Sequence, residues 1–198
     1  LIALARLQPS DRVLDLACGR GDTVFAAVPR VQRAVALDLT FRMLQLAKQR
    51  EAPLKERRCH ARFVTGDMLA RPFADHTFTV VTVGYGLRNV PDLQQSLREI
   101  RRVLAPGGRL LSLDFNRPSN PIVRSAYLAY LTVVGSALGF ALHRDPDTYR
   151  YIPESIRNYP GASGVKRMME ELGFSDVRVV PVLGGLMAIH VASRDTAP

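Results

Sequence analysis

The stretch VLDLACGRGDTVF, residues 13–25, is the part of this sequence that decides the expected fold. An apolar run contains one aspartate, and two glycines separated by a single residue come before a second aspartate. Such a run is typical of a buried strand, here ending near Leu16, and the glycines allow a tight turn before a helix that starts near Asp22. Backbone at this turn can approach a ligand closely, because ligands of open α/β sheets bind at the carboxyl ends of the strands.

Further strands and helices alternate along the first half of the chain. Short runs rich in valine and leucine predict buried strands at 33–38, 61–67, 78–85 and 109–115. Helices are expected at 40–51, from a threonine cap, and at 91–104, where Asp92 is the expected N-cap and a Pro-Gly-Gly sequence ends the helix. We therefore expect an α/β fold with a Rossmann-like, doubly wound and mostly parallel sheet.

The second half of the chain departs from this pattern. A turn-rich break is followed by an apolar run at 125–142 that carries no charged residue. A polar, tyrosine-rich segment without a clear period then leads to a last helix at 164–172 and two strands, joined by a Gly-Gly pair that is typical of an antiparallel hairpin. The expected organisation is a single domain over residues 1–198, with a substrate-covering insertion at about 117–160.

Composition and charge limit the kinds of partner. The chain has 198 residues, 47% of them hydrophobic, and its 27 lysines and arginines against 18 aspartates and glutamates give a net charge of +9. This excess favours an anionic partner, such as nucleic acid, an acidic membrane face or an anionic substrate. The densest basic run, 55–62, also fits a solvated loop.

The cysteines and the first residues bear on the compartment. Cys18 and Cys59 lie far apart without a CxxC motif, so we expect neither a disulfide framework nor a zinc site, and a cytoplasmic location fits. The opening LIALARL is too short for a signal peptide and lacks the basic leader of one.

Acidic residues around the glycine turn indicate the charge of the ligand. A dinucleotide fingerprint would have a third glycine where Val24 stands, and Asp22 at the helix start would repel a pyrophosphate. S-adenosylmethionine (SAM) has no phosphate and carries a sulfonium and an amino group. Asp15 is placed to face that amino group, directly or through water.

Two more acids follow the next strands. Asp38 ends the second strand, where a carboxylate can accept from both ribose hydroxyls, and Asp67 follows the third, where it can accept from the adenine amino group with Met68 against the ring. An aspartate at a strand end is also a common helix cap, but three in register favour a SAM site. The predicted residues are Asp15, Ala17, Gly19, Gly21, Asp38, Leu39, Gly66, Asp67 and Met68.

Four segments resemble a known family, the ubiquinone/menaquinone biosynthesis C-methyltransferases of the UbiE/MenG type, which are class I methyltransferases. These segments are VLDLACGRGD, GYGLRNVPD, RRVLAPGGRLLSLDFNRP and YRYIPESIRNYP, and the match spans about residues 11–192. Many methyltransferases share the first segment, whereas GLRN and YIPESI are far more specific. The resemblance implies methyl transfer from SAM to a ring carbon of a polyprenyl hydroquinone such as demethylmenaquinol, with the backbone at Gly84 and Tyr85 against the methionine end of SAM.

The chain differs from that family in three places. Thr79 stands where Phe-Asp is usual, and Asp114 stands where glutamate is common. The sequence begins at Leu1, and members of the family carry an N-terminal segment over the active site; whether one precedes Leu1 is left open.

The expected chemistry needs alignment and a deprotonated acceptor, and it requires no metal. Alignment alone can contribute roughly 7–11 kcal/mol. Since a phenol has a pKa of about 10, a nearby cation or base helps the hydroquinone carbon to attack. We predict that Arg88 stabilises the phenolate or orients a water, although a structural arginine that caps carbonyls is the alternative.

For the other polar residues, a role in the active site and a purely structural role both fit the sequence. Asn89 is predicted to position the ring or the loop, and Tyr151 and Ser155 to line the acceptor pocket; each is also compatible with a structural role. Arg157 and Asn158 are expected to hold the insertion on the sheet. For His190 a satisfied strand histidine is favoured over an acid/base group.

The apolar run 125–142 allows three interpretations. A membrane-spanning helix is one interpretation, because the run is near span length and has Gly135 and Gly139 in the spacing of packed membrane helices, with Arg124 and Arg144 beside it. A buried lid helix is the favoured expectation. A surface that dips into an anionic bilayer to collect a prenyl tail is the second, and it would place the protein peripherally at the cytoplasmic membrane face.

The competing functions differ mainly in the molecule that accepts the methyl group. A SAM-dependent methyltransferase for another small or lipid acceptor would have the same SAM half. Nucleic acid is not expected as a partner, because GYGLRNV stands where amino-methylating DNA enzymes carry an acidic or Asn-Pro-Pro-aromatic cluster. A non-catalytic SAM-binding subunit and a homodimer are left open.

Overall fold

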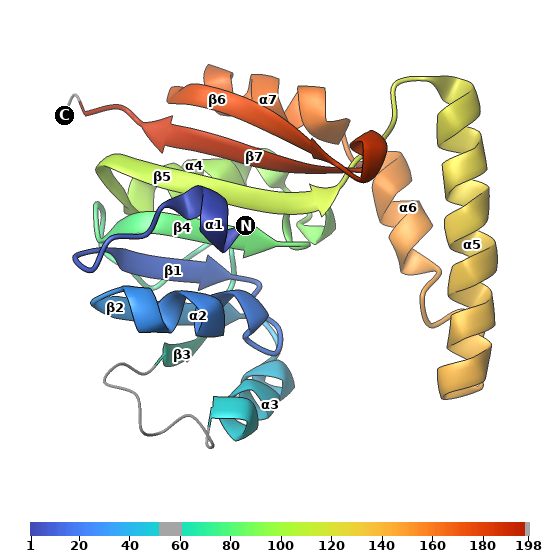
Figure 1. Ribbon diagram of the computed structural model, residues 1–198, viewed down its shortest axis with the longest axis horizontal. Coiled ribbons are helices and arrows are strands. Elements are labelled where there is room, and N and C mark those ends of the chain that lie inside the picture. The colour runs from blue at the N-terminus through green and yellow to red at the C-terminus, as the bar shows by residue number, and fades with distance from the viewer. Residues whose placement is uncertain (52–60, 197–198) are drawn as a thin grey trace.

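The computed structural model describes residues 1–51 and 61–196, and its centre is a seven-stranded sheet (Figure 1). The strand order is β3-β2-β1-β4-β5-β7-β6. All neighbours from β3 to β5 are parallel, whereas β7 is antiparallel to both β5 and β6. The predicted fold class, a mostly parallel doubly wound sheet with a C-terminal antiparallel hairpin, is confirmed.

The strands have the following bounds: β1 Arg12–Leu16, β2 Arg33–Asp38, β3 Ala61–Thr65, β4 Phe78–Gly84, β5 Leu104–Phe115, β6 Phe174–Val182 and β7 Met187–Arg194. The α-helices are α1 Ile2–Ala5, α2 Asp22–Ala27, α3 Phe41–Glu51, α4 Leu93–Val103, α5 Pro121–His143, α6 Tyr151–Asn158 and α7 Gly161–Glu171. Short 3-10 turns, η1 Val28–Arg30, η3 Leu87–Asn89 and η4 Leu183–Gly185, complete the connections.

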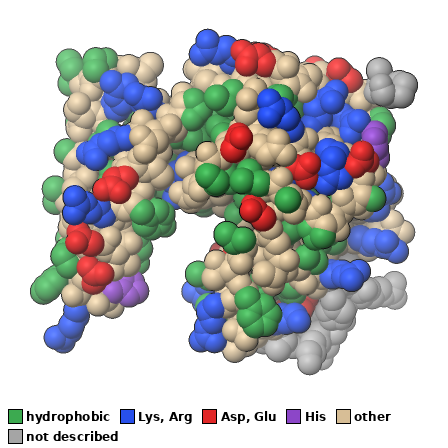
Figure 2. All heavy atoms as spheres, turned by 180° about the vertical axis from the view of Figure 1, so that it is seen from behind, with side chains coloured by type: hydrophobic (Ala, Val, Ile, Leu, Met, Phe, Trp, Pro, Cys, Tyr) green, Lys and Arg blue, Asp and Glu red, His purple; other side chains and the backbone are tan. Residues whose placement is uncertain are grey.

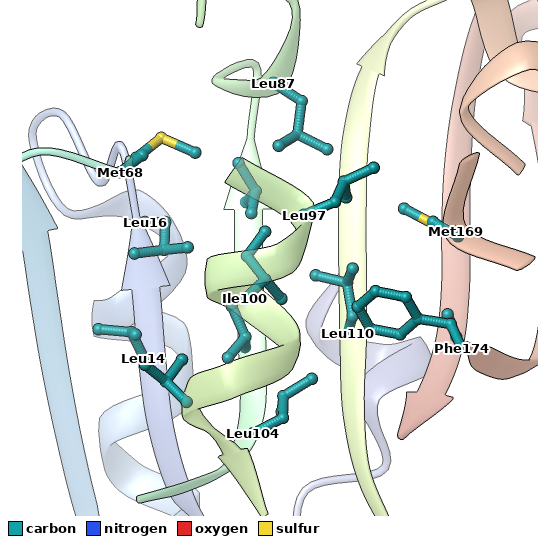
Figure 3. Close-up of a cluster of buried hydrophobic side chains, with 14 of the residues drawn as sticks. Leu14, Leu16, Met68, Leu87, Leu97, Ile100, Leu104, Leu110, Met169 and Phe174 are labelled. Carbon is teal, nitrogen blue, oxygen red and sulfur yellow. The ribbon is translucent and has the colours of Figure 1, made fainter. Parts of the chain in front are cut away.

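Each face of the sheet has its own hydrophobic core. Successive residues of a strand point to opposite faces, so Leu14 and Leu16 join one core while Val13 joins the other. The first core packs beneath α4 and α7, where Ile100 and Met169 are fully buried (Figure 3). The second core packs beneath α1, α2 and α3. The two cores fix the sheet, and therefore fix where its carboxyl edge lies.

Several predicted boundaries need correction. The Asp92 cap is confirmed, because its side chain accepts from the backbone N–H of Gln95. The Pro-Gly-Gly sequence lies inside β5 and not in a turn, at a place where the β4–β5 register shifts. The third strand ends at Thr65, so Asp67 lies two residues beyond it. Helix α6 was not expected, because the polar segment that forms it has no clear period.

Helices α5 and α6, here called the α5–α6 block (residues 121–158), stand at the carboxyl edge of the sheet (Figure 1). The favoured expectation of a buried lid is wrong for α5, since only 17% of its most apolar window is buried. The 23 residues of α5 are long and apolar enough to cross a membrane by length and composition. Figure 2 shows a deep notch between this block and the rest of the molecule.

The glycines of α5 have an internal explanation. A Cβ built on Gly139 would lie 2.5 Å from the backbone oxygen of Asp145, and one on Gly135 would lie 3.4 Å from Tyr149. These glycines let the chain after α5 fold back along the helix. The basic run 55–62 falls largely outside the described residues, and so does Cys59.

Candidate active site

The glycine turn after β1 holds the backbone in an unusual conformation. Ala17, Gly19 and Gly21 all have positive φ, at 48°, 53° and 86°. A Cβ on Gly21 would come within 2.6 Å of the Phe25 ring, whereas one on Gly19 would meet nothing within 4 Å. Gly21 therefore serves the packing of the turn, and Gly19 leaves open space in front of the backbone.

A cavity of about 320 Å³ opens at this turn. We call it the donor cavity. Five predicted cofactor residues line it: Asp15, Ala17, Gly19, Gly84 and Tyr85. The carboxyl ends of β1 and β4 thus meet at one hollow, as the parallel register of the two strands requires.

Asp15 is the most perturbed acid of the donor cavity. Its side chain is 1% exposed, and its Oδ1 accepts from the Thr82 hydroxyl at 2.7 Å. Its Oδ2 has no hydrogen-bond partner in the described part of the chain. Burial, with smaller contributions from Asp22 and Asp38, raises the pKa of Asp15 to about 7, although the hydrogen bond from Thr82 opposes the rise. A buried carboxylate with a free oxygen suits a cationic ligand group.

Asp38 is tied to the glycine turn from the end of β2. Its Oδ2 accepts from the backbone N–H of Gly19 and its Oδ1 from that of Thr40, both at 2.8 Å. Each carboxylate oxygen can accept a further hydrogen bond, so these contacts leave capacity for ribose hydroxyls. Leu39, which follows, is 70% exposed. The structure places both residues outside the lining of the donor cavity.

The predicted residues after β3 also lie outside this lining. Gly66 donates its N–H to the carbonyl of Asp38, which joins the ends of β2 and β3. Asp67 is exposed, and its Oδ1 accepts from the backbone N–H of Leu69 at 2.8 Å. Met68 is 8% exposed and packs in the core beneath α4, which leaves little of its side chain for an adenine ring.

Sequence reasoning missed several residues that line the donor cavity. They are Leu1, Cys18, Arg20, Thr23, Met43 and Leu113, whereas Asp22, which also lines the cavity, was expected to face the ligand. Met43 is a half-exposed apolar residue in the first turn of α3, directly after the end of β2. The sequence did contain a signal for Met43. It is an apolar residue in the first turn of the helix that follows an acidic strand end.

Arg88 lies beyond β4 in η3 and is almost completely buried. Its Nη1 lies 2.7 Å from Oδ1 of Asp114 and also donates to the carbonyl of Tyr85 at 3.1 Å. Its Nε donates to the Ser155 hydroxyl of α6 at 3.2 Å, and the Phe115 ring lies 4.8 Å from the guanidinium carbon. Burial raises the pKa of Asp114, and the charge and hydrogen bonds of Arg88 oppose the rise.

These contacts make Arg88 the junction of three elements. It joins the end of β4 to the end of β5 through Asp114, and it joins both to α6 through Ser155. The geometry agrees with the structural alternative for this arginine, and its catalytic role stays a prediction. Asn89 lies beside it and donates to the carbonyl of Tyr85 at 3.2 Å. Tyr151 is 51% exposed at the start of α6.

The structure also tests the roles expected for His190, Arg157 and Asn158. His190 is a satisfied strand histidine, as favoured, because its Nε2 lies 2.9 Å from the Ala162 carbonyl and its Nδ1 3.4 Å from the Ser112 hydroxyl. Burial lowers its pKa. Arg157 and Asn158 do not hold the block: both are exposed, and within the described residues their side chains make no hydrogen bond or ion pair.

Tyr159 is a residue that sequence reasoning passed over. It is 3% exposed, and its hydroxyl has no hydrogen-bond partner among the described residues. Burial raises its pKa well above the ordinary range, with a further contribution from the charge of Asp114. The YRYIPESIRNYP segment offered three tyrosines, and only the tertiary packing shows which of them is buried.

Comparison with known proteins identifies the family. Residues 2–194 match the model of the ubiE/COQ5 methyltransferase family. The chain belongs to this family. A demethylmenaquinone methyltransferase of Staphylococcus aureus is 35% identical over 187 residues, which are 93% of this chain and 76% of that relative. The expected family resemblance is thereby confirmed.

Solved structures support the fold. A SAM-dependent methyltransferase from Aquifex aeolicus superposes with a TM-score of 0.69 at 17% identity, covering 97% of this chain and 86% of that one. A protein from Pyrococcus horikoshii OT3 gives 0.70 at 20% identity, with 98% and 86% covered. At these identities the likeness concerns the fold alone.

As a member of this family, the chain is a SAM-dependent methyltransferase. The donor cavity fits the cofactor, because its buried Asp15 has an oxygen without a described partner and its backbone is open at Gly19. Asp15 and the backbone around Gly84 would hold the methionine end of SAM, and Asp38 the ribose.

Proposed function

We propose that the protein transfers a methyl group from SAM to a ring carbon of a polyprenyl hydroquinone, such as demethylmenaquinol, in quinone biosynthesis. The observation that carries this proposal is the 35% identity to a demethylmenaquinone methyltransferase over 93% of the chain. Helix α5 also presents an exposed apolar surface, which suits an acceptor with an apolar polyprenyl tail.

The residues of the chain supply position and charge in this reaction. Bound SAM supplies an activated methyl group. Asp15 and Asp38 hold the cofactor, and the hydroquinone lies beyond Tyr85, toward η3 and the α5–α6 block. Arg88, held in place by Asp114, is the predicted group that stabilises the phenolate or orients a water that takes the hydroxyl proton. Asn89 and Tyr151 are the further predicted contacts of the acceptor.

A lipid-soluble acceptor fits a protein that works at a membrane surface. Helix α5 exposes Ile122, Tyr130, Val133 and Phe140 by between 61% and 78%. With Ala126 and Ala137 these residues follow one another at intervals of three or four, so they form one stripe along the helix. We propose that a cytoplasmic protein touches an anionic membrane face through this stripe. The same surface also suits a homodimer.

Methyl-labelled SAM and purified demethylmenaquinol test the proposal. We expect label on a ring carbon of the quinone by mass spectrometry, and loss of labelling in Asp38→Ala, with circular dichroism to check that this variant is folded. Label in no quinone, with SAM still bound, would redirect the search to another small or lipid acceptor.

A further inference from the structure

A second cavity, of about 340 Å³, lies where the chain leaves the sheet for the α5–α6 block and where it returns. We call it the linker cavity. Its walls come from residues 116–119, from residues 160–163 and from Arg124 in the first turn of α5. The two linkers are joined directly, because Oδ1 of Asn116 accepts from the backbone N–H of Ala162 at 2.8 Å.

The linker cavity is positively charged. Arg117 and Arg124 line it, and no aspartate or glutamate does. The Nε of Arg117 is buried and has no hydrogen-bond partner in the described part of the chain. Neither arginine side chain forms an ion pair with any of residues 1–51 or 61–196. Both arginines are partly exposed at the cavity, so an anion there would meet two guanidinium groups that have no competing carboxylate.

Hydroxyl groups and helix α7 add donors to the same wall. Ser119 and Ser163 both line the cavity. Helix α7 has 11 residues, and although Asn116 occupies the backbone N–H of Ala162, the start of the helix adds a partial positive charge to this wall. Two arginines, two hydroxyls and a helix start form a donor set suited to a tetrahedral oxyanion.

We propose that the linker cavity binds a phosphate group. Arg117 belongs to the linker and Arg124 to α5, so one phosphate that contacts both fixes the α5–α6 block relative to the sheet. The phosphate comes either from a lipid headgroup or from free phosphate. The lipid source rests on the proposed function, because it needs α5 at a membrane, whereas the phosphate site itself does not.

The test measures binding to the whole chain without SAM or quinol, so its outcome does not depend on methyl transfer. Inorganic phosphate and monomeric dihexanoyl phosphatidylglycerol are titrated separately and followed by ³¹P NMR. The variant is Arg117→Met/Arg124→Met. The matched control, Arg144→Met/Arg157→Met, removes the same charge from two exposed arginines that do not line the cavity.

We expect both ligands to bind the wild type and the control, and at least tenfold weaker binding to the Arg117→Met/Arg124→Met variant. A lipid that binds tenfold more tightly than inorganic phosphate assigns the site to headgroups, and equal affinities assign it to free phosphate. The proposal is overturned if the wild type binds neither ligand, or if the control loses as much affinity as the variant. Single variants at Arg117 and Arg124 keep the test valid if the double variant does not fold.

Discussion

The two sides of the active site are built in opposite ways. The donor cavity is formed by strand ends and a backbone turn, with Asp15 buried and Asp38 bonded to the N–H of Gly19. The α5–α6 block is attached through a small apolar cluster, in which Tyr127, Leu128 and Ile156 pack with Phe115 and Leu186, and through the hydrogen bonds Arg88–Ser155 and Tyr127–Leu186. The cofactor side is therefore built from the strand ends of the sheet itself, whereas the acceptor side is joined to the sheet through one small apolar cluster and a few hydrogen bonds.

The largest effect is expected where the two halves meet. Arg88→Met leaves the buried Asp114 without its counter-charge, which costs about 3–5 kcal/mol of unfolding free energy. Urea unfolding measures it. Arg88→Met/Asp114→Asn removes the uncompensated charge and keeps an acceptor for the backbone, so we expect it to recover more than half of the loss. Equal stability of the two variants would show that Arg88 is not a structural junction.

Asp15→Asn separates ligand binding from stability. Loss of a charged partner should weaken SAM binding by roughly 10–100-fold, measured by calorimetry. The folded pKa of Asp15 lies above its unfolded value, so the native state binds more protons between these values and loses stability as pH rises toward 7. The asparagine removes this loss, and Tm at pH 8 should rise. A lower Tm together with weaker binding would instead indicate a damaged fold.

The pKa of Asp15 also predicts the pH dependence of SAM binding. Only the carboxylate attracts a cation, and a pKa of about 7 makes it mostly protonated at pH 6. We therefore expect SAM affinity to fall roughly eightfold between pH 7.5 and pH 6. Asp15→Asn should show a flat profile over this interval. A wild-type profile as flat as that of the variant would contradict the assignment of Asp15 to the donor.

Ser155→Ala tests the attachment of the block alone. It removes the hydrogen bond from Nε of Arg88, which contributes about 1 kcal/mol, and we expect KM for the quinol to rise about fivefold while the Kd of SAM is unchanged. Ser175→Ala, which loses a hydrogen bond at the far side of the sheet, is the control. If both variants changed KM equally, the effect would be general destabilisation.

The smallest effect on the fold is expected at the exposed stripe of α5. Val133→Ser and Phe140→Ser should change the unfolding free energy by less than about 0.5 kcal/mol, because both side chains are more than 60% exposed. Co-sedimentation with phosphatidylglycerol vesicles should nevertheless fall about threefold, because apolar contact is lost. Ser125→Ala, an exposed position away from the stripe, serves as the control. Unchanged sedimentation in both stripe variants would remove α5 from the membrane contact.

The same contrast explains what the sequence could predict. Strand ends and the glycine turn follow from local patterns, which is why Asp15 and Gly19 were predicted from the residues, whereas Gly84 followed only from the family resemblance. The partner of Arg88 could not be found, because Asp114 is distant in sequence and reaches it only through β5 pairing with β4. The exposure of α5 was missed because an apolar run indicates burial in a core as readily as exposure to another partner.

The α5–α6 block leaves and re-enters the sheet at one place, where Asn116 bonds to Ala162. A short peptide could therefore join the two linkers without moving a strand of the sheet. The block is in this sense an exchangeable cassette. Relatives that shared the donor half could acquire new acceptors by replacing the whole cassette, and a chimera with a foreign cassette between these two residues would keep its cofactor.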